Sequence, residues 1–249
     1  MSVELLQQAA SHAAWLSAVL RGSVGVEQTL DVLSAGAEPP MFVVLDTADP
    51  LTLPFAVAEW RRRGVSGWLY LPLAPGDAAA IPGPGSFSAA ALDQGVALVA
   101  AGAPLVGLIP HQSGHGLLWE EHETSGPGRP PLESPAEADR LLLEALNRAV
   151  TALETHDLGS WRDEADALRD QWAGSEPMPP GTDPRSERIA QRSRRILELL
   201  ERATSDDGGS RTAADVAIRR SAFADLSRAA RQAHAVAWNT GLRRAAEPG

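Results

Sequence analysis

Three histidines and their acidic neighbours are the side chains of this sequence best suited to chemistry. His111, His115 and His122 fall within twelve residues, and three glutamates, Glu120, Glu121 and Glu123, flank the last of them. Imidazole and carboxylate groups are ligands for zinc, manganese or iron, and they can form a metal site without thiolates. The stretch is therefore a candidate metal site, provided that a turn brings two strand ends together. A polar hairpin tip with solvated histidines explains the same residues, and we prefer that simpler interpretation.

Two residue types on which many enzymes depend are missing from the sequence. The absence of cysteine excludes disulfides, thiol nucleophiles and thiolate zinc sites. All 22 basic residues are arginine, which also excludes a Walker P-loop, a Schiff-base lysine and a protein-kinase catalytic core. No G-x-S-x-G or H-E-x-x-H motif occurs. These absences favour a non-catalytic protein without a cofactor, and metal-assisted hydrolysis at the histidine stretch is the enzymatic alternative.

Asp46 is a second candidate binding residue. It follows the apolar run Phe42–Leu45, and a carboxylate just past the end of a buried strand often lines a ligand crevice. A local turn or helix cap before Pro50 explains it more simply.

A row of arginines marks a predicted helix near the C-terminus. Arg188, Arg195 and Arg202 are seven residues apart, so they line one narrow stripe of that helix. Pairing with acidic helices earlier in the chain is the plain explanation. The functional alternatives are an acidic protein partner and a phosphate-bearing ligand.

Two further arginines interrupt the apolar stripes of predicted helices. Arg192 and Arg219 project among apolar residues, where an unpaired guanidinium is costly to bury. We expect each to reach solvent or to form a structural ion pair. For Arg219 we expect partial burial and a bond that holds the helices in register, with one of four carboxylates as partner: Glu144, Glu154, Glu164 or Asp166.

Charge is unevenly distributed along the chain. The net charge is −10, yet from residue 185 onward there are 13 arginines and only 8 acidic residues. The acidic remainder disfavours nucleic acid as a partner, although the basic segment keeps that class open as the last alternative. The longest apolar run, residues 96–110, is too short and too broken for a bilayer that needs ~20 residues. With no basic signal region at the N-terminus, we expect a cytoplasmic protein, and the composition is typical of a high-GC bacterial genome.

The order of the predicted elements indicates an α+β fold. Residues 1–130 should form an α/β domain, a small mixed sheet with flanking helices. Runs at 41–45 and 67–73 enclose a helix that begins at Pro54, which predicts a parallel pair of strands. Three further strands, at 96–101, 105–109 and 117–123, are separated by short turns and predict an antiparallel meander.

The second part of the chain, residues 131–249, should form a four-helix domain. The sequence Ser134-Pro-Ala-Glu137 is a capping box with proline at the first helical position, and it predicts where the first of these helices begins. Short loops between the four helices favour an antiparallel bundle. Because charged amphipathic helices are the most organised feature, we expect a protein-interaction or regulatory role, through a protein partner or through self-association of these helices.

Overall fold

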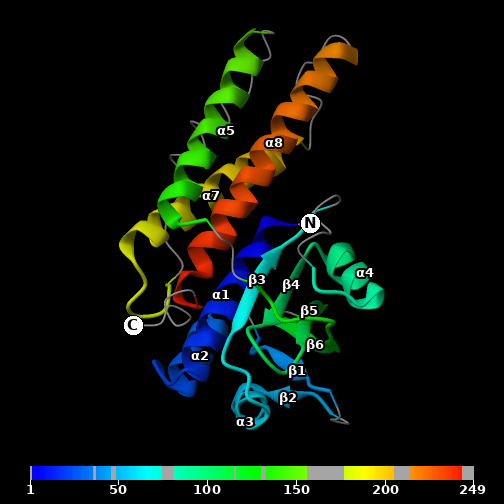
Figure 1. Ribbon diagram of the computed structural model, residues 1–249, viewed down its shortest axis with the longest axis vertical. Coiled ribbons are helices and arrows are strands. Elements are labelled where there is room, and N and C mark those ends of the chain that lie inside the picture. Colours follow the sequence, from blue (N-terminus) through cyan, green and yellow to red (C-terminus); the bar gives the residue numbers. More distant parts are fainter. Residues whose placement is uncertain are drawn as a thin grey trace.

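A computed structural model shows the protein as a six-stranded mixed sheet with flanking helices and a group of packed C-terminal helices (Figure 1). This arrangement confirms the predicted α+β fold. The residues described are 2–35, 38–45, 49–74, 81–114, 116–129, 133–155, 177–204 and 213–242.

Most elements lie where the sequence predicts them. The helices are α1 (Val3–Leu20), α2 (Val26–Leu33), α3 (Leu53–Arg63), α4 (Gly85–Gln94), α5 (Pro135–Thr155), α7 (Pro184–Thr204) and α8 (Ala213–Trp238). The strands are β1 (Met41–Val43), β2 (Leu51–Thr52), β3 (Trp68–Pro72), β4 (Val96–Ala100), β5 (Val106–Ser113) and β6 (Gly116–Glu123). The helix predicted to begin near Ser160 lies outside the described residues.

The strands follow the order β2-β1-β6-β5-β4-β3 across the sheet. Strands β4, β5 and β6 pair antiparallel, which confirms the predicted meander. The predicted parallel pair of β1 with β3 is wrong. β1 is parallel to β6, whereas β3 lies at the far edge, antiparallel to β4. The physical reason is that the meander, whose strands close over short turns, occupies the positions between β1 and β3.

Helices cover the two faces of the sheet unequally. On one face α1 and α3 pack over an aromatic core, in which the Trp60 ring lies 5.0 Å from both Phe42 and Trp68, measured between centroids. On the other face α4 lies over β4 and β5, with Phe87 packed against Gly107. A side chain at Gly107 would collide with that ring, so the glycine permits the close approach. Beyond α4, this second face carries half-buried polar side chains.

The C-terminal helices extend from the first face of the sheet. α5 and α8 lie side by side and project beyond the strands, and α7 packs against both (Figure 1). The apolar stripe of α8 that Arg219 interrupts is largely buried, with Phe223, Leu226 and Ala230 among its buried residues. One hydrophobic core contains residues of α1, the sheet, α5, α7 and α8, so the two halves share their interior. A domain boundary between residues 130 and 131 stays a prediction. No helix among the described residues is long and apolar enough to cross a membrane.

β3 is the last strand of the sheet, and side chains from α1 and from the end of α8 bond to the N–H and C=O groups of its outer edge. Asn239, directly after α8, accepts from the Tyr70 N–H and donates to the Tyr70 carbonyl, both at 2.9 Å. Ser17 of α1 does the same for Trp68, at 2.8 Å and 3.2 Å. An edge strand presents unpaired N–H and C=O groups, and burying them unpaired is costly. The two side chains therefore replace the missing neighbouring strand.

Replacing Asn239 with alanine should destabilise the protein by about 2–4 kcal/mol, because the buried N–H and carbonyl of Tyr70 both lose their partner. Urea unfolding followed by circular dichroism measures the change. Asn147→Ala, on an exposed position of α5, is the matched control and should change stability by less than about 0.5 kcal/mol. Equal effects of the two substitutions would show that the edge contact contributes nothing.

Candidate functional site

The β5–β6 hairpin carries the candidate site. Ser113 pairs with Gly116, so the turn contains two residues, and Gly114 has φ of 58°, a left-handed conformation that glycine adopts readily. This tight turn lets β5 run on to residue 113. His111 therefore lies within a strand, two residues beyond the strand end predicted at residue 109. His115 lies outside the described residues.

Strand pairing brings three of the candidate ligands onto one face of the sheet. Glu120 pairs with Ile109 across the hairpin and His122 with Gly107, while His111 pairs with Leu118. Directly paired residues share a face, and residues two apart on a strand do so as well. His111, Glu120 and His122 therefore project to the side that α4 partly covers.

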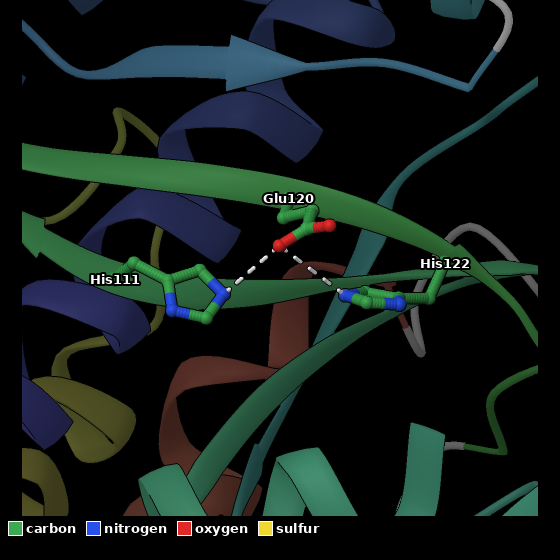
Figure 2. Close-up of side chains that lie close together, drawn as sticks. All are labelled: His111, Glu120 and His122. Atoms are coloured by element: carbon green, nitrogen blue, oxygen red, sulfur yellow. Dashed lines mark ion pairs between the residues drawn. The ribbon is translucent and has the colours of Figure 1, made fainter. Parts of the chain in front are cut away.

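The three side chains converge on one carboxylate oxygen. Oε2 of Glu120 lies 3.2 Å from Nε2 of His111 and 3.9 Å from Nε2 of His122 (Figure 2). All three ligand atoms lie within 4.8 Å of one another. The side chains of His111, Glu120 and His122 are 41%, 47% and 30% exposed, so the cluster is open to solvent on one side.

Both imidazole Nε2 atoms are shielded from solvent, although the side chains as a whole are not. Neither makes a hydrogen bond within the described part of the chain, because the contact of His111 with Glu120 lacks hydrogen-bond geometry and that of His122, at 3.9 Å, is too long. The ring of Phe87, centred 6.2 Å from that of His122, forms an apolar wall beside it. A buried polar atom without a partner is uncommon, and a bound water or ion is one explanation for it.

The spacing of the three atoms suits a small divalent ion. Zinc bonds of about 2.0–2.2 Å hold tetrahedral ligand atoms roughly 3.3–3.6 Å apart. The contact of His111 with Glu120 is already near this range, and the contact of His122 is a few tenths of an ångström too long. The two imidazole ligand nitrogens lie within 4.8 Å of each other, so the imidazoles would have to move closer together to bind one ion. Two histidines and one carboxylate leave a fourth position open, as in zinc sites that activate water.

Glu121 faces the opposite way from Glu120 and has a structural role. It is fully buried, and its Oε1 lies 2.8 Å from Nη2 of Arg63 at the end of α3. Its Oε2 also accepts from the backbone N–H of Leu45 at 3.4 Å. The alternation of side chains along β6 thus gives two adjacent glutamates different partners.

The other predicted binding residues lie away from the cluster. Asp46 is outside the described residues. Arg188, Arg195 and Arg202 are exposed along α7.

The two arginines of the apolar stripes link helices of the C-terminal group. Arg192 pairs with Asp139 of α5. Arg219 is half-buried; its Nη2 donates to the carbonyl oxygen of Ala203 at 2.6 Å, and its guanidinium lies 5.2 Å from the centre of the Phe223 ring. Two of its four expected carboxylate partners, Glu164 and Asp166, lie outside the described residues, so that ion pair stays a prediction.

Two buried histidines were not predicted. Nδ1 of His12 accepts from the indole N–H of Trp119 at 2.9 Å. Nδ1 of His234 lies 3.1 Å from the Tyr70 hydroxyl, and the indole of Trp238 donates to its Nε2, also at 3.1 Å. Each lies in a helix among many alanines, which is the one signal that the sequence offers.

Burial sets the charge of both histidines. It lowers the pKa of His12 from 6.5 to about 4. It lowers the pKa of His234 to about 3, and the nearby positive charge of Arg194 adds to this effect. Both rings are therefore neutral near pH 7, when each can accept a hydrogen bond.

The fold and the cluster define an α+β protein with a candidate His2Glu metal centre on an open sheet face. Two family models match the chain. The model for the Rv1486c-like protein, N-terminal domain, covers residues 9–136, and that for the C-terminal domain covers residues 136–235. The chain therefore belongs to the Rv1486c-like protein family. Neither a curated protein nor a solved structure matches it.

Replacing Glu121 with glutamine should cost about 3 kcal/mol of stability, because Arg63 would keep its partly buried charge without the carboxylate. Chemical unfolding at pH 7 measures this loss. Glu123→Gln, at an exposed position of the same strand, is the control and should have little effect. A loss no greater than that of the control would contradict the structural role.

The buried histidines should make the protein sensitive to mild acid. The folded-state pKa values lie below the unfolded value of 6.5, so the unfolded chain binds more protons as the pH falls below 6.5. Each histidine then removes up to about 1.4 kcal/mol of stability per pH unit. His12→Gln should reduce the slope of stability against pH between about 6.5 and 5 by that amount. Urea titrations across this range test it, and an unchanged slope would contradict it.

Proposed function

We propose that this protein binds a divalent transition metal ion, zinc in the first instance, through His111, Glu120 and His122. The observation that carries the proposal is the pair of Nε2 atoms that face one carboxylate oxygen, shielded from solvent and without a hydrogen bond to any described residue. A bound cation would give both nitrogens a partner. It would also suit a ligand set of imidazole and carboxylate in a chain that contains no cysteine.

The proposed role of the metal is regulatory, in a cytoplasmic bacterial protein. The cluster lies on an open sheet face, and its three side chains are between 30% and 47% exposed. An ion held there could take its remaining ligand from a partner protein. The exposed arginine row of α7, Arg188, Arg195 and Arg202, offers a second surface, suited to an acidic partner or to self-association.

Metal-assisted hydrolysis is the second candidate function. Three protein ligands leave at least one coordination position for water, and a bound metal ion lowers the pKa of that water. The grouping of only three candidate ligands, His111, Glu120 and His122, among the described residues is the observation that favours this candidate.

Zinc titration followed by calorimetry tests the proposed site, with protein made without a histidine tag. The wild type should bind one zinc ion. Glu120→Gln should weaken binding by more than the roughly 10–100-fold loss that follows removal of an outer-sphere partner. Glu123→Gln is the matched control, because it makes the same change three residues further along β6. This variant should bind zinc as the wild type does. Equal affinity of all three proteins, or no binding by the wild type, would refute the site.

The same proteins separate the two candidate roles. Zinc-dependent hydrolysis of p-nitrophenyl acetate or bis(p-nitrophenyl) phosphate, lost in Glu120→Gln, would establish the hydrolase. Zinc binding without such turnover would support the regulatory role.

A further inference from the structure

A polar cavity lies between the N-terminal helices, the β5–β6 hairpin and α7. Its volume is about 520 Å³, within the range of roughly 300–1,000 Å³ that holds small-molecule ligands in proteins. The hairpin contributes Leu117, whose side chain faces away from the metal-ligand face of the sheet. The cavity is therefore separate from the candidate metal centre.

One wall of the cavity is a polar stripe on the otherwise apolar helix α1. Gln8, Ser11 and His12 are spaced so that they share a helix face, and all three line the cavity. Ser11 and His12 are almost fully buried, at 7% and 5% exposure. Polar groups buried in this way are expected to have partners, and here they line an empty space large enough for a ligand.

His12 presents a fixed hydrogen-bond donor. Because Nδ1 accepts from Trp119, the proton of the neutral ring is on Nε2. Burial lowers the pKa of His12 to about 4, so the ring stays neutral at ordinary pH. The stripe thus combines an imidazole N–H, a hydroxyl and a primary amide, which together donate and accept without carrying charge.

Two of the charged groups on the opposite wall pair with each other, and a third accepts a backbone hydrogen bond. Arg194 pairs with Glu198 at 2.7 Å, and Glu201 accepts from the backbone N–H of Val3 at 3.3 Å. The full charged lining comprises four carboxylates and two guanidinium groups. An anion such as phosphate would meet a net negative wall, and an apolar ligand would leave the α1 stripe without hydrogen bonds.

From these features we infer that the cavity binds an uncharged, hydroxyl-rich small molecule, a saccharide or polyol of about mono- to disaccharide size. Hydroxyl groups can both donate and accept, so they match the amide, hydroxyl and imidazole of Gln8, Ser11 and His12. This ligand site is independent of the metal centre, and either could exist without the other.

Nuclear magnetic resonance titration of the full chain tests the inference. The indole N–H resonance of Trp119 reports on the cavity, because that group bonds to His12. The probes are D-glucose, maltose and glycerol, with glutamate, inorganic phosphate and spermidine as charged comparisons. At least one saccharide or polyol should shift the resonance saturably, and the charged probes should not.

Two variants locate the binding. The double variant Gln8→Ala/Ser11→Ala should weaken the affinity about tenfold, as expected when two neutral hydrogen bonds are lost. Gln28→Ala, at an exposed position of α2, should leave it unchanged. Unaltered circular dichroism and melting temperature show that each variant is folded. Equal binding by the double variant, a response only to charged probes, or no response to any probe would each overturn the inference.

Discussion

Closure of the β3 edge is the constraint on which the rest of the architecture depends. The strand ends the sheet, and its outward N–H and C=O groups lie too deep in the protein to bond to water. Ser17 and Asn239 supply the missing partners, and they come from opposite ends of the chain. The hydrogen bonds to the backbone of this one strand thus hold α1 and α8 against the same edge of the sheet. They also account for the hydrophobic core on this side of the sheet, to which both halves contribute.

The two candidate sites follow from this arrangement and from the hairpin between them. Fixing α1 beside α7 leaves the polar cavity between these helices and the hairpin. On its other face the hairpin is only partly covered by α4, and His111, Glu120 and His122 converge there. Alternation along β6 assigns the neighbouring glutamates to different roles, Glu120 with the histidines and Glu121 with Arg63. A shift of one residue in strand register would exchange these roles and destroy both arrangements.

Local sequence signals predicted the elements and their fold class but not all of their neighbours. Turn residues and apolar runs marked the strands, and the pairing of β4, β5 and β6 followed from short connections. The position of β3 at the edge could not be predicted, because it depends on Asn239, 169 residues away from Tyr70. The histidine stretch was recognised by composition alone. The approach of His111 and His122 to Glu120 depends on the two-residue turn at Gly114, because this tight turn lets β5 continue past His111.

X-ray absorption spectroscopy of the zinc-loaded protein tests the metal centre most directly, because it reports the atoms bound to the ion. We predict nitrogen and oxygen ligands at about 2.0–2.2 Å, with the multiple-scattering signature of two imidazoles. His111→Ala should reduce that signature to one imidazole. A zinc ion surrounded only by water and carboxylate oxygens, or a wild-type signature that His111→Ala leaves unchanged, would contradict a centre formed by His111, Glu120 and His122.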